Sequence, residues 1–334
     1  MKTRQVIVKD LPKGTLTQDH FALTETDLPA PKEGELLIRT ILMSIDAANR
    51  AWMQGATYRA AILAGDPMHT YALAEVIDSR APKFTKGDII AVETVWADYA
   101  VVPAKGAQKM PPVETLSHLM SVFGIAGKTA FHGLLSVGRP LPGETVVVSA
   151  AAGSVGAYVG QIAKAVGCRV VGIAGGAEKC KWVVDDLGFD ACVDYRDPAW
   201  HKALKAACPE GIDIYFDNVG GNILETVLFR MNERGRVVCC GAVSQYDATA
   251  PSGPRNLPGL VVVKRLRMEG FIVMDYAHED TTALRALQNW VKSGAIKVPE
   301  DIVEGLENAP AALIGLLAGE NRGKRMVRVG PDAV

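Results

Sequence analysis

The sequence predicts an α/β protein with a doubly wound parallel sheet plus a β-rich domain. Three observations predict this. A β-branched run passes directly into a glycine-rich turn and a helical pattern over residues 145–156. Strand and helix patterns then alternate from Gly143 to about Gly294. Before Pro112, short β-rich runs are instead separated by proline and glycine.

The first part of the chain predicts a partly open antiparallel barrel or sandwich, because its strands are short and closely spaced. The expected strands are residues 5–10, 34–46, 73–80, 87–96 and 98–103.

The second part predicts strands that alternate with helices, as a parallel sheet covered on both faces requires. The expected strands are residues 146–150, 169–174, 191–195, 212–219, 235–243 and 266–274. The expected helices are Val155–Val166, Glu178–Leu187, Asn222–Met231 and Thr281–Val291. The tail contains a further strand-like run, residues 323–329, which could return to the first domain.

The glycine-rich turn has the order of strand, turn and helix that a dinucleotide site requires. Gly153 lets the backbone approach a pyrophosphate, and Gly156 lets the helix pack closely on the strand. Ala151 stands where the first glycine of the pattern is expected, so the motif is degenerate. Small residues at such a junction also occur for packing alone.

The end of the second buried strand indicates the type of nucleotide. An NAD site usually places an acidic residue there for the ribose hydroxyl, but this chain has Gly175, Gly176 and Ala177, followed by Lys179. A nearby cation and no carboxylate favour a 2′-phosphate, and therefore NADP over NAD. The alternative is that Lys179 is only a solvated helix residue, although a cation in a first turn opposes the helix dipole.

Composition excludes several other classes. The chain has 334 residues, 49% of them hydrophobic, with 36 basic and 37 acidic residues. Two domains can each bury a core, and nucleic acid is not an expected partner. The N-terminus lacks the apolar core of a signal peptide and no apolar stretch is long enough to cross a bilayer, so we expect a cytoplasmic protein without a membrane partner.

The cysteines and histidines predict no metal site. All 6 cysteines lie in the second half without a C-x-x-C spacing, and the 6 histidines are scattered singly. Tetrahedral zinc needs several such ligands that converge. Buried thiols that act as small apolar groups are the expected role of the cysteines.

Several motifs in order over nearly the whole chain resemble zinc-independent members of the medium-chain dehydrogenase/reductase superfamily. The branch is that of prostaglandin reductase (leukotriene B4 12-hydroxydehydrogenase), plant double-bond reductases and curcumin reductase. The motifs are residues 133–179, 187–196, 212–221, 235–246, 266–273 and 320–329. The resemblance implies a GroES-like domain over residues 1–122 and 298–334, a Rossmann-type domain over residues 123–297, bound NADPH and a homodimer.

The resemblance also implies a set of cofactor-binding residues. Lys179 and Tyr195 match the pair that holds the 2′-phosphate, and Asn218 matches an Asn near the nicotinamide ribose. The pyrophosphate turn is matched by Gly153, Ser154, Val155 and Gly156, and the loop after a later strand by Cys240, Gly241, Ala242, Ser244 and Tyr246. The strand beside the nicotinamide is matched by Phe271, Ile272 and Val273, and the returning tail by Asn321. Phe271 and Val273 could alternatively be plain sheet core.

The implied reaction is hydride transfer to the β-carbon of an α,β-unsaturated ketone or aldehyde, without a metal. Ala47, Ala48 and Val263 replace two tyrosines and a proline that relatives have, so no donor to the enolate follows by alignment, and we expect a wider pocket. The candidate donors are Tyr246 and Tyr71, then Asn49, Arg50 and Tyr58. The ribose hydroxyl of the cofactor is a further candidate proton relay.

Two other functions remain open from the sequence. A quinone oxidoreductase uses the same fold and cofactor but passes electrons to a quinone. The second alternative is a protein that binds NADPH with little catalysis, because this chain lacks the two tyrosines that relatives have in the substrate pocket.

Overall fold

The computed structural model describes residues 1–57, 59–248, 250 and 252–332. The chain divides into two compact units. The first unit is Met1–Met120, Glu300–Glu320 and Arg325–Val334; the second unit is Ser121–Pro299 and Asn321–Lys324. Among the described residues, no helix has both the length and the apolar character that crossing a membrane requires.

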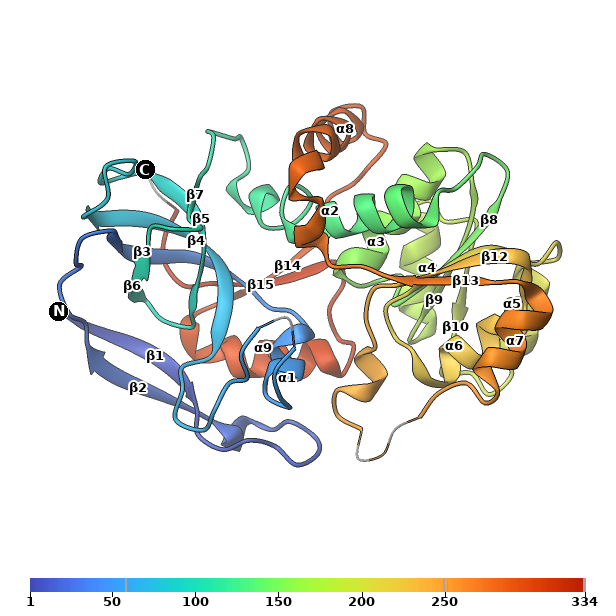
Figure 1. Ribbon diagram of the computed structural model, residues 1–334, viewed down its shortest axis with the longest axis horizontal. Coiled ribbons are helices and arrows are strands. Elements are labelled where there is room, and N and C mark those ends of the chain that lie inside the picture. Colours follow the sequence, from blue (N-terminus) through green and yellow to red (C-terminus); the bar gives the residue numbers. More distant parts are fainter. Residues whose placement is uncertain (58, 249, 251, 333–334) are drawn as a thin grey trace. The chain divides into compact units, whose positions relative to one another are not determined.

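In the described part of the second unit, six strands form a parallel sheet in the order β10-β9-β8-β11-β12-β13 (Figure 1). The strands are β8 (Thr145–Ser149), β9 (Arg169–Ala174), β10 (Ala191–Asp194), β11 (Ile212–Asp217), β12 (Met231–Cys239) and β13 (Arg267–Gly270). The chain proceeds outward from β8 on one side and from β11 on the other. The strand order therefore reverses between β8 and β11, which is where doubly wound sheets bind ligands.

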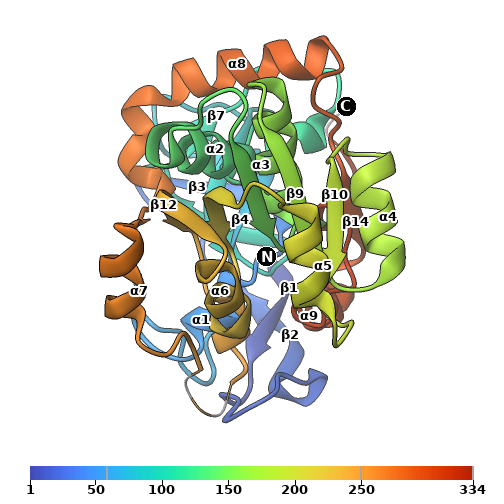
Figure 2. The same ribbon diagram turned by 90° about the vertical axis from the view of Figure 1, so that its right-hand side faces the viewer.

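Helices cover both faces of this sheet (Figures 1 and 2). Alternate residues of β8 face opposite sides: Val146 and Val148 pack with α2, α3 and α8, whereas Val147 packs with α5, α6 and α7. The helices are α2 (Ile125–Phe131), α3 (Ser154–Ala165), α4 (Ala177–Asp185), α5 (Trp200–Ala207), α6 (Gly221–Leu228), α7 (Leu257–Lys264) and α8 (Asp280–Lys292). Shorter turns are the π-helical η3 (His132–Gly138) and the 3-10 helices η4 (Val243–Gln245) and η5 (Val273–Glu279).

The first unit has a separate, mainly antiparallel sheet. Together with the parallel sheet of the second unit, this confirms the predicted α/β fold class with a β-rich domain. Among its described residues the strand order is β14-β15-β3-β4-β5-β7, β6 also pairs with β3, and β1 and β2 form a hairpin. The strands are β1 (Lys2–Val8), β2 (Phe21–Asp27), β3 (Glu35–Ser44), β4 (His69–Ser79), β5 (Ile89–Val95), β6 (Tyr99–Pro103), β7 (Gln108–Lys109), β14 (Glu300–Glu304) and β15 (Lys324–Arg328). The helices are α1 (Ala48–Trp52) and α9 (Ala309–Leu317), with 3-10 turns η1 (Gln18–His20), η2 (Leu116–Leu119) and η6 (Leu306–Asn308).

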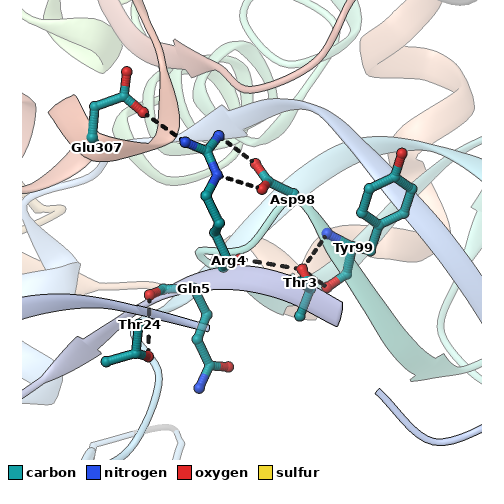
Figure 3. A network of polar contacts seen from close by, with 7 residues as sticks. All are labelled: Thr3, Arg4, Gln5, Thr24, Asp98, Tyr99 and Glu307. Atoms are coloured by element: carbon teal, nitrogen blue, oxygen red, sulfur yellow. Dashed lines mark hydrogen bonds and ion pairs between the residues drawn. The ribbon is translucent and has the colours of Figure 1, made fainter. Parts of the chain in front are cut away.

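The tail returns to the first unit as the sequence predicted. Met326 in β15 pairs antiparallel with Ser44 in β3. The N-terminal strand is tied to the same unit by polar contacts (Figure 3). Arg4 donates two hydrogen bonds to Asp98, at 2.7 and 3.1 Å, and a longer one to Glu307. The Asp98 carboxylate raises the pKa of Arg4.

Two predicted strands of the second unit extend well past the observed ends, and among the described residues five helices were missed, namely α1, α2, α5, α7 and α9. The expected strand 235–243 ends at Cys239, and Val243 already begins η4. The expected strand 266–274 ends at Gly270, and Val273 already begins η5. Phe271, Ile272 and Val273 therefore follow β13 and do not lie on it. The helices α5 and α7 were not predicted, because α5 is short and α7 has an apolar run, Val261–Val263, that is typical of neither an amphipathic helix nor a loop.

Candidate functional site

The pyrophosphate turn follows β8 directly and leads into α3. Gly153 caps α3, and its N–H donates to the carbonyl of Ala150 at 2.8 Å. A Cβ on Gly156 would lie only 2.3 Å from that carbonyl oxygen, so the helix can approach the strand only with glycine here. The left-handed residue of the turn is Ala150, with φ of 49°, rather than Ala151.

Ser154 provides a test of whether this turn fits a phosphate. Its Oγ is buried at the first residue of α3, and none of the described residues offers it a hydrogen bond. A buried hydroxyl without a partner is costly unless a ligand satisfies it. The first N–H groups of a twelve-residue helix also point toward this end. The turn therefore fits the diphosphate group of a dinucleotide.

The predicted 2′-phosphate residues gather at the carboxyl end of β9. A Cβ on Gly175 would lie 3.0 Å from the Tyr195 hydroxyl, so this side chain covers the glycine. Lys179, in the first turn of α4, donates to the carbonyl of Asn321 at 2.6 Å. The structure thus brings Lys179, Tyr195 and Asn321 together within the second unit.

The segment 321–324 is attached to the pyrophosphate turn. The N–H of Gly323 donates to the carbonyl of Ala152 at 2.8 Å, and the Asn321 side chain donates to the carbonyl of Gly323 at 2.9 Å. Asn321 is consequently buried, at 6% exposure. Asn321, the tail residue that we expect at the cofactor, is therefore held between the pyrophosphate turn, through Gly323, and Lys179 at the start of α4.

A buried carboxylate organises the point where the strand order reverses. Asp217, at the end of β11, accepts hydrogen bonds from the Tyr215 hydroxyl at 2.8 Å and from the N–H groups of Val219 and Gly220. Burial raises the pKa of Asp217, while these hydrogen bonds oppose the rise. Asp217 was not predicted, because its role depends on contacts that only the folded sheet creates.

Asn218 links the ends of β8 and β11. Its side-chain NH₂ donates to the carbonyl of Ser149 at 2.8 Å, and its own N–H donates to the Ser149 hydroxyl at 2.9 Å. Asn218 therefore lies at the reversal point of the sheet, at the edge where ligands bind.

The loop after β12 folds over Asn218. The N–H groups of Cys240 and Gly241 donate to the carbonyl of Asp217, and that of Val243 donates to the carbonyl of Asn218. Ser244 donates its hydroxyl to the carbonyl of Val219 at 2.6 Å. The predicted cofactor loop thus adjoins the predicted ribose residue.

Two titratable groups of this loop are kept neutral. Burial raises the pKa of the Cys240 thiol to about 12, which makes it a poor nucleophile. Burial also raises the pKa of Tyr246, whose hydroxyl lies near Gly241. Tyr246 therefore stays protonated and is suited to donate a hydrogen bond.

Phe271 packs into the core of the second unit. Its ring makes edge contacts with Phe216 and Tyr276, and a Cβ on Gly133 would lie 2.5 Å from its tip. Ile272 is 37% exposed, and Val273 begins a 3-10 helix. The predicted contact of these three residues with a cofactor stays a prediction.

The other candidate donors belong to the first unit. Asn49 is 1% exposed, its Oδ1 accepts the N–H of Asp46, and its Nδ2 donates to the carbonyl of His69. Arg50 is 2% exposed and donates to the carbonyl of Gly14. Both side chains are thus engaged in holding α1. Tyr71 is half-buried on β4, opposite Glu93, and Tyr58 lies outside the described residues.

Metal ligands do not converge in the part of the chain that the structure describes: it contains no group of three or more His, Cys, Asp and Glu side chains placed to hold an ion.

The strand order, the glycine turn and the residues at the reversal point define a dinucleotide-binding domain of the kind found in oxidoreductases. Two family models match this chain. One is described as the N-terminal domain of oxidoreductase and covers residues 4–110; the other is described as zinc-binding dehydrogenase and covers residues 154–289.

Known proteins match over nearly the full length. The NADPH-dependent curcumin reductase of Escherichia coli (strain K12) is 41% identical, over 99% of this chain and 98% of that protein. Prostaglandin reductase 1 of Mus musculus is 40% identical, over 95% and 96%. The crystal structure of CurA in complex with NADPH from Vibrio vulnificus superposes with a TM-score of 0.93 at 38% identity, over 98% and 99%. The chain belongs to the medium-chain dehydrogenase/reductase superfamily, in the branch of curcumin reductase and prostaglandin reductase.

Proposed function

We propose that this chain uses NADPH to reduce the C=C bond of α,β-unsaturated ketones and aldehydes. The observation that carries the proposal is the full-length similarity to NADPH-dependent curcumin reductase, at 41% identity. The second unit supports it with a glycine turn whose buried Ser154 hydroxyl lacks a partner among the described residues, and with Lys179 and Tyr195 beside Gly175.

The residues of the second unit bind and orient the nucleotide. Ser154 and the first N–H groups of α3 hold the diphosphate, and Lys179 and Tyr195 hold the 2′-phosphate. Asn218 and the loop that contains Cys240, Gly241, Ala242 and Ser244 position the nicotinamide end. Bound NADPH supplies a hydride to the β-carbon of the conjugated bond.

The chain then stabilises the charge that develops on the carbonyl oxygen, until the α-carbon of the enolate takes up a proton from water or from a donor in the site. A neutral phenol suits this task because it donates a hydrogen bond to an oxyanion without losing its proton first. Tyr246 is the first candidate, because its hydroxyl would lie 3.7 Å from a Cβ on Gly241 in the loop that we assign to the nicotinamide end, and Tyr71 is the second. Asn49 and Arg50 come last, since their described hydrogen bonds already hold α1.

We assign residues 1–122 and 298–334 to a substrate domain and residues 123–297 to a cofactor domain, in a cytoplasmic protein. We further propose a homodimer. Val262 and Val263 on α7 are 72% and 69% exposed, and Phe229 nearby is 58% exposed. This apolar surface adjoins β13, the last strand in the sheet order, and an apolar patch beside a sheet edge favours association.

The test is NADPH oxidation by the purified protein with an enone, with the matching saturated ketone and with a quinone. NADPH carrying deuterium at C4 should place the label on the β-carbon of the saturated product. Turnover with the quinone and not with the enone would contradict the proposal. Tight NADPH binding without turnover of any activated alkene would instead support a binding protein.

A further inference from the structure

A second cation lies beside Lys179 at the carboxyl end of β9. A Cβ on Gly175 would lie 3.1 Å from Nε of Arg196, and a Cβ on Gly176 would lie 3.9 Å from its Nη1. The guanidinium therefore covers both glycines, and at Gly175 it lies next to the Tyr195 hydroxyl, which is 3.0 Å from the same Cβ position. The sequence pattern did not single out Arg196, because it follows the end of β10 by two residues and looks like an ordinary exposed loop residue.

The fold fixes the backbone of Arg196 at this place. Asp194 uses one oxygen, Oδ1, to accept the N–H of Gly176 at 2.8 Å and the N–H of Arg196 at 2.9 Å. The N–H of Tyr195 donates to the carbonyl of Ala174 at 3.1 Å. The turn after β9 and the turn after β10 are thus held together, and Asp194 positions the backbone from which the Arg196 side chain extends.

The other charged side chains near Gly175 and Gly176 already make contacts of their own. Lys179 donates to the carbonyl of Asn321, so its ammonium also anchors the tail segment. Arg322 faces Glu178 at 3.4 Å. Within the described ranges no carboxylate pairs with the guanidinium of Arg196. The acidic neighbour is Asp194, whose oxygen is engaged by the two backbone N–H groups.

We propose that Arg196 binds the 2′-phosphate of NADPH and, together with Lys179, sets the preference for NADPH over NADH; this rests on the proposed function. A guanidinium presents two parallel N–H groups that match two phosphate oxygens, whereas an ammonium acts as a point charge. Phosphate on the ribose next to Gly175 meets this fork. A ribose without that phosphate offers the guanidinium of Arg196 no anion to bind, so Arg196 discriminates between the two nucleotides.

The test is calorimetric binding of two fragments, adenosine 2′,5′-bisphosphate and adenosine 5′-monophosphate, to the full chain. Arg196→Gln should weaken binding of the bisphosphate by about 10- to 100-fold, the range expected for hydrogen bonds to a charged group, and leave the monophosphate unchanged. Arg196→Lys should lose less, because it keeps the charge but not the fork. Lys202→Gln, a change at an exposed cation on the neighbouring α5, is the matched control and should bind both fragments as the wild type does.

The result that overturns the inference is an Arg196→Gln variant that binds the bisphosphate as the wild type does, or that loses both fragments equally. Failure of the proposed reaction has a different signature. In that case the wild type would not reduce an enone with NADPH, while the Arg196-dependent preference for the bisphosphate would persist.

Discussion

Single polar atoms decide what the cofactor site can hold. Asp217 and Ser149 link the ends of β8 and β11, yet neither was predicted, because an Asp or Ser at a strand end has no distinctive local pattern. Arg196 was missed for the same reason. Lys179, in contrast, was predicted, because the absence of an acidic residue at a known distance from the glycine turn is a signal that the sequence alone contains.

The hydroxyl of Ser154 leads to the first prediction. Ser154→Ala should weaken the binding of NADPH and NADH alike by about 10-fold, since it removes one hydrogen bond to a charged diphosphate. The free energy of unfolding without nucleotide should rise by about 1 kcal/mol, because the substitution removes a buried hydroxyl that has no described partner. Calorimetry and urea unfolding measure the two effects. A loss for NADPH alone would place the hydroxyl at the 2′-phosphate and contradict the assignment.

The choice of oxyanion donor gives the second prediction. Tyr246→Phe should lower kcat for enone reduction by about 10-fold, or about 1.4 kcal/mol, and raise the Kd of NADPH by a smaller factor, because the phenolic donor is lost while the ring stays in the cofactor loop. Tyr71→Phe is the parallel variant in the first unit. Steady-state kinetics with a single enone measures both. If the double variant turns over as fast as the wild type, neither phenol donates and the ribose hydroxyl is the better candidate.

Among the elements, buried strands were predicted more reliably than the segments between them. The expected strand 169–174 agrees with β9 at both ends, because a short apolar, β-branched run is typical of a parallel strand that is buried on both faces. The strand expected over 266–274 failed at Gly270, since the chain then turns toward the 3-10 helix η5, and Phe271 packs partly against the core while Ile272 and Met274 are exposed. Local apolar character cannot distinguish a buried strand from a partly exposed apolar turn.

The contact between α3 and β8 carries the third prediction. Gly156→Ala should destabilise the protein by about 1–3 kcal/mol and weaken nucleotide binding, because the added Cβ would lie 2.3 Å from the carbonyl oxygen of Ala150 and must displace the helix. Gly55→Ala is the matched control, as a Cβ there meets nothing within 4 Å. Thermal unfolding with and without NADP reports both quantities. Equal behaviour of the two variants would show that the turn tolerates displacement.

For the whole molecule, sequence motifs predicted the cofactor half of the site and left the substrate half open. The residues that we propose to bind the nucleotide lie in one unit and follow one another at the ends of successive strands, so their places follow from the fold. Candidate donors to the substrate come from separate parts of the chain, and this chain has Ala47 and Ala48 where the family resemblance implies a proline and a tyrosine. Substrate preference therefore depends on side chains that no local pattern identifies.

The apolar surface on α7 tests the proposed homodimer. Replacing Val262 and Val263 with Asp should convert a dimer into a monomer in sedimentation experiments, because each exposed valine contributes about 2 kcal/mol when a partner buries it and a carboxylate opposes that burial. Leu141→Asp is the control, since Leu141 is a similarly exposed apolar residue of the same unit, at 62%, but precedes β8, an inner strand of the sheet. Lys264 keeps α7 in place through its hydrogen bonds to the carbonyls of Phe229 and Met231, so the fold should persist in the variant. A wild type that sediments as a monomer, or a variant that stays dimeric, would rule out this surface as the interface.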